Sequence, residues 1–288
     1  MRSEFPVVGI VSDPTTFRLM TPAILALGID AHFLDSSELS SLPTFSRNCD
    51  VVSIIGSEAT ESPIRVLERE GIAVRPSSMT WQSAKGFKKR TENSEQEYAV
   101  IVARSPHDQA SIWAPSQISR TQKGHTLNIS PPLDLSSREV AEIQSLVLDA
   151  ARKIELVGVA SVKIEKTNKE FDICSIELGP HIEGAWTVYG SHTNQFEQHL
   201  RAILDLPLGD PVTTSRFVVT AEFSKNGDAD MYRPNLHLMA RSPGLKIHHY
   251  RNVDSGPVGH VSAFGGNLLD LVESVEHALE YLNGEIDE

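Results

Sequence analysis

The sequence has few cysteines, no excess of positive charge and no long apolar run. Cys49 and Cys174 are its only cysteines, and both lie in apolar, strand-like contexts, which favours buried free thiols over a disulfide framework. Lysine and arginine number 26 against 38 acidic residues, so the net charge is −12 and a nucleic-acid partner is not expected. No stretch approaches the ~20 apolar residues that span a bilayer, and MRSEFPVVGIV lacks the apolar segment of a signal peptide. We therefore expect a cytoplasmic protein with no membrane association.

The first third of the chain alternates between short apolar runs and helical patterns. This spacing predicts an α/β fold in which a doubly wound parallel sheet forms an N-terminal domain. The expected strands are 6–11, 32–35, 49–55 and 72–76, and the expected helices are 14–27, 62–71 and 82–90. Asp13 before Pro14 is a typical helix N-cap.

The chain is organised around the stretch 156–210. Two β-branched runs, VGVASVKI (157–164) and FDICSIEL (171–178), are predicted to be neighbouring strands of a largely buried sheet. The loop GPH (179–181) ends the second strand, and a helix is expected from about Thr193 until Pro207 stops it. A further amphipathic helix, expected at 136–155 with Ser136 or Ser137 as its cap, leads into the first strand. Strand ends of this kind are where α/β proteins place ligands.

The runs GPHIEGAWT and NQFEQHLRAILDLPLGD resemble the carboxyaminoimidazole ribonucleotide synthases of purine biosynthesis, which are ATP-grasp enzymes. The segments VVGI, CDVV, VRPS, YAVIVAR, IWAPSQI and HTLNISPP extend the resemblance. It implies a Rossmann-like pre-ATP-grasp domain over residues 1–84, an ATP-grasp body over 85–215 and a small β-rich C-terminal domain over 216–288. In the last of these, strands are expected at RFVVTAEF, PNLHLMA, KIHHYR and GHVSAFG, and a closing helix at 268–282.

Two segments depart from the family pattern. The family has a lid subdomain, with a glycine-rich flap and a lysine for the triphosphate, before the strand that resembles YAVIVAR; here the polar linker TENSEQE (91–97) stands in its place. The family's glycine loop is replaced by SDPTTFRL (12–19), in which Asp13 would repel an anionic ligand and Phe17 would crowd it.

The positions of the family's metal-binding carboxylates also differ. Lys163 stands where the first glutamate is required, and the second position falls on Glu177 or on Ser175, depending on whether a gap is placed in the loop. We expect an ion pair between Lys163 and Glu177 in place of a metal, with Glu177 as the one candidate metal ligand. The family's basic pair near the C-terminus is replaced by DSGPVGH (254–260). The histidines of this last segment fit no metal-ligand pattern and are expected to be solvent-facing strand residues: His237, His248, His249 and His260.

These losses favour a degenerate, lid-less relative of the synthase that lacks autonomous ligase activity and acts by binding a metabolite or a partner protein. The alternative is an active ATP-dependent carboxylation of aminoimidazole ribonucleotide with an unusual site or a lid supplied by a partner. The first hypothesis assigns no catalytic residue and expects no cofactor; ATP and Mg²⁺ are expected only under the alternative. A homodimer is expected in either case. The residues expected to line a remnant pocket are Arg18, His181, Glu183, Trp186 and Tyr189.

Overall fold

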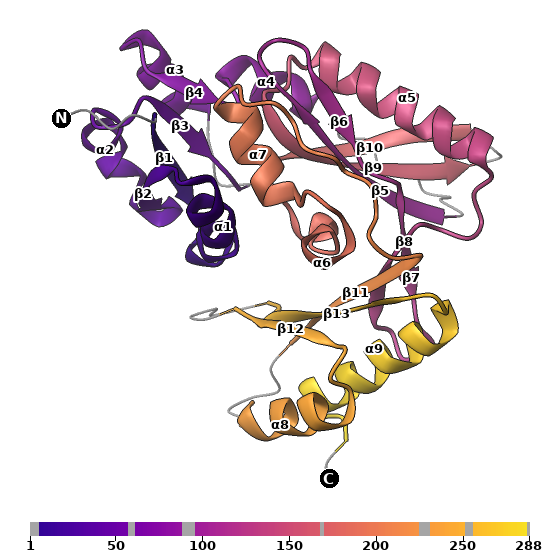
Figure 1. Ribbon diagram of the computed structural model, residues 1–288. Coiled ribbons are helices and arrows are strands. Elements are labelled where there is room, and N and C mark those ends of the chain that lie inside the picture. The colour runs from indigo at the N-terminus through magenta and orange to yellow at the C-terminus, as the bar shows by residue number, and fades with distance from the viewer. Residues whose placement is uncertain are drawn as a thin grey trace.

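The computed structural model describes residues 6–56, 61–87, 96–167, 170–224, 231–250 and 256–286. These residues form two β-sheets with helices packed on their faces, as Figure 1 shows. The smaller sheet contains the N-terminal strands and the larger one contains all the later strands. The mixed α/β class predicted from the sequence is confirmed.

The smaller sheet is parallel, with strand order β2-β1-β3-β4, as the spacing of the N-terminal segments predicts. Its strands are β1 (Val7–Ser12), β2 (Asp30–Asp35), β3 (Val51–Ile54) and β4 (Ala73–Arg75). Its helices are α1 (Pro14–Leu27), the 3₁₀ helix η1 (Ser36–Ser41), α2 (Leu42–Ser46), α3 (Glu61–Arg69) and α4 (Ser78–Lys85). Helix α4 starts earlier than the predicted 82–90, because Ser77 accepts a hydrogen bond from the backbone of Thr80 and caps it there.

The larger sheet has nine antiparallel strands in the order β10-β9-β5-β7-β8-β11-β13-β12, with β6 paired to β5. Its strands are β5 (Gln96–Arg104), β6 (Ala110–Ile112), β7 (Ser116–Arg120), β8 (Thr126–Ser130), β9 (Gly158–Thr167), β10 (Glu170–Leu178), β11 (Phe217–Phe223), β12 (Lys246–His249) and β13 (Gly259–Gly265). The pairing of β8 with β11 continues the sheet from the predicted body into the predicted C-terminal domain. The boundary proposed between residues 215 and 216 therefore crosses a single sheet.

The helices that accompany the larger sheet are α5 (Ser137–Lys153), the 3₁₀ helix η2 (Ile182–Gly184), α6 (Thr187–Gly190), α7 (Gln195–Ile203), α8 (Tyr232–Arg241) and α9 (Leu268–Leu282). Helix α5 begins with the predicted capping box, in which Ser136 and Glu139 each accept from the other's backbone N–H. Its buried face covers one side of β5, β9 and β10. The opposite side of these strands carries Lys163 and Glu97 and faces the C-terminal strands.

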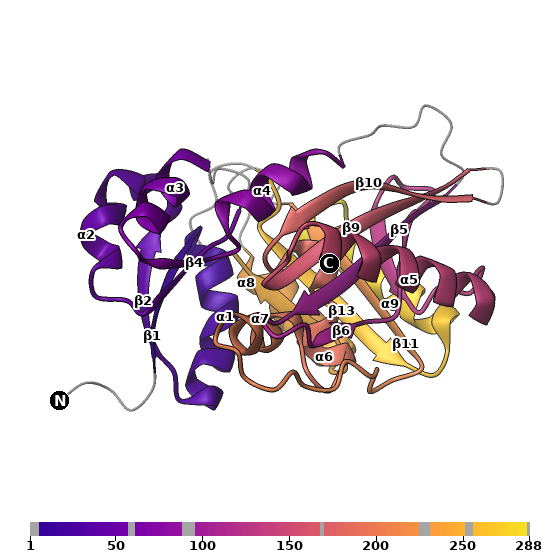
Figure 2. The ribbon, with the colours of Figure 1, turned by 90° about the horizontal axis from the view of Figure 1, so that it is seen from above.

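Helix α7 joins the two sheets, as Figure 2 shows from above. Phe196, Leu200 and Ile203 pack against apolar residues of β1 and α1. Beside these residues on α7, His199 is fully buried between β3 and β9 and hydrogen-bonds to both strands. The run that carries the strongest resemblance to the family therefore holds the N-terminal sheet against the larger one.

Two predictions for the C-terminal segment are wrong. PNLHLMA is not a strand; it lies in helix α8, so His237 is a helical residue. His260 is not solvent-facing, because its side chain is fully buried beneath His248 with the two rings 4.7 Å apart.

The connection between α4 and β5 runs from residue 86 to residue 95. Of the expected linker at 91–97, residues 91–95 lie outside the described residues, and Gln96 and Glu97 belong to β5.

Candidate functional site

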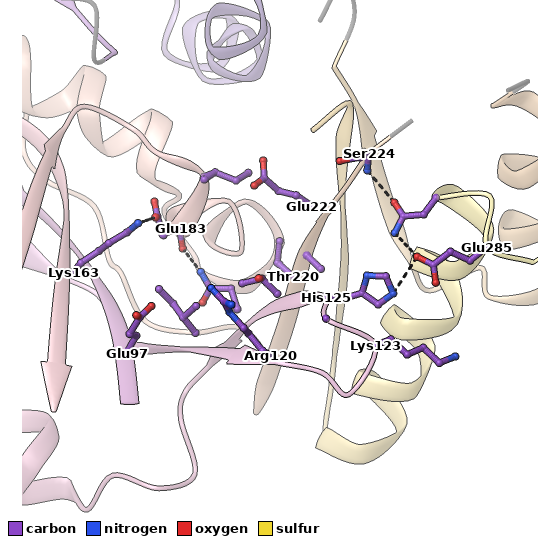
Figure 3. A pocket seen from close by; sticks show the side chains of 17 residues that line it. Glu97, Arg120, Lys123, His125, Lys163, Glu183, Thr220, Glu222, Ser224 and Glu285 are labelled. Atoms are coloured by element: carbon purple, nitrogen blue, oxygen red, sulfur yellow. Dashed lines mark hydrogen bonds and ion pairs between the residues drawn. The ribbon is translucent and has the colours of Figure 1, made fainter. Parts of the chain in front are cut away.

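A cavity of about 780 Å³, the sheet cavity, lies on the open face of β5 and β9 (Figure 3). Strands β7, β8 and β11 and the chain after α9 form its other walls. Its lining mixes both signs of charge. The charged and titratable side chains are Arg120, Lys123, His125 and Lys163 together with Glu97, Glu183, Glu222 and Glu285.

A second cavity of about 370 Å³, the junction cavity, adjoins the first one and lies between the start of α1 and the loop after β10. Ile182 and Glu222 line both cavities. No lysine or arginine lines the junction cavity among the described residues. Its polar lining consists of Asp13, Thr15, Thr16, Trp81, Glu177, His181, Gln195, Glu222 and Tyr250.

The loop that separates the two cavities is held from three sides. The Gln195 side chain accepts from the backbone N–H of His181 at 3.0 Å and donates to its carbonyl oxygen at 2.7 Å. Asn128 donates to the carbonyl oxygen of Glu183 at 2.8 Å. Gly184 packs so closely on Gln195 that an added Cβ would lie 2.3 Å from the amide oxygen. These contacts hold the backbone of the loop at His181, Glu183 and Gly184.

Lys163, Glu183 and His181 form a chain of three charged or titratable groups across this loop. The Lys163 ammonium lies 2.8 Å from Oε1 of Glu183, and Nδ1 of His181 contacts Oε2 of the same carboxylate. The Glu183 side chain is only 11% exposed, against 41% for Lys163 and 39% for His181. A buried carboxylate needs partners of this kind, because the loss of hydration must be offset by nearby positive charge or by hydrogen bonds.

The expected ion pair between Lys163 and Glu177 is wrong. Lys163 bonds to Glu183 instead, and Glu177 lies opposite Ser161 and lines the junction cavity. Ser175 is the direct cross-strand partner of Lys163, just after an irregularity in β10 that follows Ile173. The loop after β10 brings Glu183 back over the strand pair. Glu183, and not Glu177, is therefore the carboxylate that pairs with Lys163.

The environment of His181 keeps its imidazole neutral at pH 7. Burial and the nearby charge of Lys163 lower the pKa of His181 to about 4. Nδ1 of His181 lies against Oε2 of Glu183, but the two atoms do not form a hydrogen bond. A neutral imidazole keeps one ring nitrogen with a lone pair that can accept a proton, and the side chain lines the junction cavity.

The strand pair does not fit a Mg²⁺ ion by its own side chains. The two positions that hold metal-binding carboxylates in the family pattern carry Lys163 and, without a gap, Ser175. A lysine already bound to a carboxylate repels a divalent cation. Among the described residues, no group of three His, Cys, Asp or Glu side chains is arranged to hold a metal.

The start of α1 is also unlike an anion-binding helix N-terminus. Asp13 accepts from the backbone N–H groups of Thr15 and Thr16 at 2.8 and 3.0 Å, which confirms the predicted cap. Its carboxylate thus takes up donors that a bound anion would use. Phe17 does not crowd this place, because it stacks on Phe33 with the ring centroids 4.5 Å apart.

The five residues expected to line a remnant pocket do not share one cavity. His181 and Glu183 lie at the two cavities described above. Arg18 is exposed on α1 and lines neither of them. Trp186 is 1% exposed and packs in the core. Tyr189 lines a different cavity near α8, where its hydroxyl lies 2.9 Å from Nε2 of His248.

Two residues of the site had no signal in the sequence. Trp81 is 8% exposed and lines the junction cavity, and its indole N–H has no partner among the described atoms. Arg120 ends β7 and reaches into the sheet cavity, as Figure 3 shows, without a hydrogen bond or ion pair to any described residue. Both are single residues in segments that carry no motif, so only the three-dimensional arrangement identifies them.

Comparison with known proteins finds a partial match to one domain family. Residues 90–196 match the ATP-grasp domain family. The N5-carboxyaminoimidazole ribonucleotide synthase of Mycobacterium tuberculosis (strain CDC 1551 / Oshkosh) is 34% identical over 195 residues, which cover 65% of this chain and 45% of that protein. The synthase of Escherichia coli (strain K12) is 26% identical over 57% of this chain and 47% of its own length. The matched region is thus about half the length of these relatives.

Solved structures show the same fold. The N5-carboxyaminoimidazole ribonucleotide synthetase from Thermus thermophilus aligns with a TM-score of 0.82 at 17% identity, covering 98% of this chain and 99% of that one. The Aspergillus clavatus enzyme in complex with ADP and 5-aminoimidazole ribonucleotide aligns with a TM-score of 0.85 at 15% identity and the same coverage. The resemblance to carboxyaminoimidazole ribonucleotide synthases predicted from the sequence is confirmed.

These comparisons correct one prediction. The expectation that no cofactor is needed is wrong: an ATP-grasp domain spans residues 90–196, and the relatives with this fold include enzymes solved with adenine nucleotides. No helix in the described part of the chain is long and apolar enough to cross a membrane.

Proposed function

We propose that this chain, which carries an ATP-grasp domain, acts in purine biosynthesis by carboxylating 5-aminoimidazole ribonucleotide at the expense of ATP. The observation that carries the proposal is the pair of adjoining cavities that share Ile182 and Glu222. The relatives similar to this chain are named for the corresponding synthase, and one is solved with ADP and the ribonucleotide together. Two ligands that react with each other require two sites in contact.

The sheet cavity is the proposed nucleotide site. Its volume of about 780 Å³ is in the range of cofactor pockets. Arg120 and Lys163 supply positive charge for phosphate oxygens, and Arg120 has no competing partner among the described residues. Mg²⁺ would enter bound to the triphosphate and offset part of its charge.

The junction cavity is the proposed site of the aminoimidazole. Glu177 and Glu222 can accept hydrogen bonds from an amine, and the free indole N–H of Trp81 can donate to a ring nitrogen. The amine would attack the carbon of a bicarbonate that ATP has phosphorylated, so that the new C–N bond forms as the C–O bond to phosphate breaks, phosphate leaves and the amine loses a proton. Neutral His181 can take up this proton on its unprotonated ring nitrogen.

The short connection over residues 86–95 bears on how the nucleotide is covered. It cannot contain a subdomain, so within this proposal the cover over the sheet cavity comes from another chain, for which a second copy is the simplest source.

A second candidate function is binding of the purine-pathway ribonucleotide without turnover. It is favoured by the Lys163–Glu183 ion pair at the metal position and by the Asp13 carboxylate at the start of α1. The degenerate relative expected from the sequence belongs to this second hypothesis.

One experiment separates the two functions. ADP release is measured with MgATP, aminoimidazole ribonucleotide and bicarbonate, each omitted in turn, and calorimetry measures the binding of each ligand. Turnover that requires all three supports the first function. Ribonucleotide binding without turnover supports the second, and binding of neither ligand contradicts both.

Matched variants locate the nucleotide. Arg120→Met should weaken ATP binding by about tenfold, because one charged contact to phosphate is lost. Arg65→Met is the control, since Arg65 lies on α3 in a surface ion pair with Glu61. Equal effects of the two variants would contradict a phosphate site at Arg120.

A further inference from the structure

Lys163, Glu183 and His181 connect the two cavities directly. Lys163 and Glu183 line the sheet cavity, His181 lines the junction cavity, and the Glu183 carboxylate lies between the Lys163 ammonium and the neutral His181 imidazole. The backbone of His181 is clamped by Gln195, and that of Glu183 is held by Asn128. The backbone positions of His181 and Glu183 are therefore held before any ligand arrives.

We propose that these three residues form a relay in which an anion bound in the sheet cavity competes with Glu183 for Lys163 and thereby strengthens His181 as a proton acceptor in the junction cavity. The inference deepens the proposed function, on which its biological meaning rests. Glu183 is a positioning residue in this relay, since it acts through His181. Lys163 detects the anion.

The physical reason is the distribution of charge around one carboxylate. With the sheet cavity empty, Lys163 neutralises much of the Glu183 charge that His181 would otherwise experience. An oxyanion near Lys163 adds negative charge and draws the ammonium toward itself. The Glu183 carboxylate then stabilises the imidazolium more strongly, so the pKa of His181 rises from its lowered value of about 4.

Other groups also act on His181. Burial lowers its pKa first, and Lys163 on β9 lowers it further. The titratable groups that face the same cavity from the surrounding elements are Asp13 before α1, Glu177 on β10, Glu222 on β11 and Tyr250 after β12. These groups are present with and without the anion, and the relay concerns the change in the pKa of His181 on binding.

The coupling is reciprocal. If an anion raises the proton affinity of His181, protonation of His181 must raise the affinity for the anion by the same factor. A ligase benefits from this link, because the base for the amine is stronger when the nucleotide site is filled. A rise of about half a pKa unit corresponds to about a threefold change in affinity.

The test is an NMR titration of the histidine side chains with inorganic sulfate, which stays a dianion from pH 5 to pH 8 and stands in for a phosphate group. The His181 resonance is assigned by its loss in His181→Gln. We expect the protonated fraction of His181 at pH 5 to rise with sulfate, by about half a pKa unit, while sodium chloride of equal ionic strength has no such effect. An unchanged His181 in the presence of saturating sulfate would overturn the proposal.

Two variants and a control distinguish the relay from a general field effect. Lys163→Met should raise the pKa of His181 without sulfate and abolish the sulfate response. Glu183→Gln should lower the pKa of His181 and cut the response to about half or less, because the shared carboxylate is gone. Lys85→Met, which removes an exposed lysine paired with Glu61 on α3, should behave as wild type. A full sulfate response in Lys163→Met would contradict the relay.

The readout needs no turnover, so its failure is separate from failure of the proposed function. A sulfate-dependent His181 in a protein that releases no ADP would leave the relay intact and remove the ligase. The backbone amide spectra of each variant report whether it is folded. Should Lys163→Met fail to fold, Lys163→Gln provides the same loss of charge with a polar side chain.

Discussion

Ser53 and His199 form a hydrogen bond of 2.8 Å across the junction of the two sheets. Nδ1 of the same imidazole accepts from the backbone N–H of Val159 at 3.1 Å, so Nε2 carries the proton and donates it to the Ser53 hydroxyl. One fully buried side chain thus links β3, α7 and β9. It stands in the run of the sequence that carries the family resemblance, and its role in the structure is to hold the sheets together.

Replacing His199 should destabilise the protein. His199→Ala leaves two buried polar groups without partners and a cavity beside β9, so we expect a loss of about 3 kcal/mol in the free energy of unfolding. Ser53→Ala removes only one partner and should cost about 1 kcal/mol. Urea unfolding followed by circular dichroism measures both. A loss below that of Ser53→Ala would show that the imidazole does not hold the junction.

Acid should destabilise the fold through the buried histidines. Burial lowers the pKa of His199 and that of His260 to about 3, against 6.5 for a free imidazole. Below pH 6.5 these histidines bind protons in the unfolded chain but stay neutral in the folded protein. The stability that depends on their neutral form is therefore complete above pH 6.5 and is lost as pH falls toward 3. Between pH 6.5 and pH 5 we expect the free energy of unfolding to fall by about 2 kcal/mol per histidine. Urea midpoints at several pH values measure the slope, which should be shallower in His199→Gln.

Gly158 should not tolerate a side chain. Its φ of +117° lies in the region that favours glycine, and an added Cβ would lie 3.0 Å from Cε1 of His199. We expect Gly158→Ala to cost about 2–3 kcal/mol in thermal or urea unfolding. Gly124→Ala is the control, since its φ is +87° and nothing lies near the added atom. Similar losses at both positions would exclude a contribution from the contact with His199.

Removing the charge of Asp13 should strengthen the binding of phosphorylated ligands in the junction cavity. Asp13→Asn keeps a side-chain oxygen that can cap α1 but removes a negative charge from the cavity wall. We expect stability to change little and the affinity for ribose 5-phosphate to rise about fivefold, which calorimetry can measure. Asp149→Asn, an exposed substitution on α5, should leave that affinity unchanged.

Much of the fold could be predicted because the local patterns agree with the final packing. Strands at 157–164 and 171–178 and the helix starting after Asn194 combine apolar periodicity with clear caps, and each formed close to its predicted bounds. Helix α8 was missed because Leu236 and Leu238 alternate with polar residues as in a strand. In the structure only Leu238 of that helix is buried, while Leu236 and Met239 remain exposed.

The candidate site was less predictable, because an ion pair between a strand and a loop residue produces no periodic pattern in the sequence. Residue spacing put Glu177 near Lys163 on the same face of the strand pair, yet the loop after Gly179 returns Glu183 to a closer position. Trp81 reaches the junction cavity from an N-terminal helix, and Arg120 reaches the sheet cavity from a hairpin. The positions of these two side chains depend on how elements that are distant in the sequence pack together.

The central place of β5 has a consequence for biosynthesis of the chain. Strand β5 lies between β7 and β9, and β9 follows it by more than fifty residues in the sequence. During translation β5 leaves the ribosome well before its partner on that side. The backbone edge of β5 therefore stays unpaired until β9 has been synthesised, and the apolar face made by Tyr98, Val100 and Val102 stays uncovered until α5 has been synthesised. Slow synthesis between these strands should therefore increase aggregation of the nascent chain, and chaperones that shield strand edges should act at this stage.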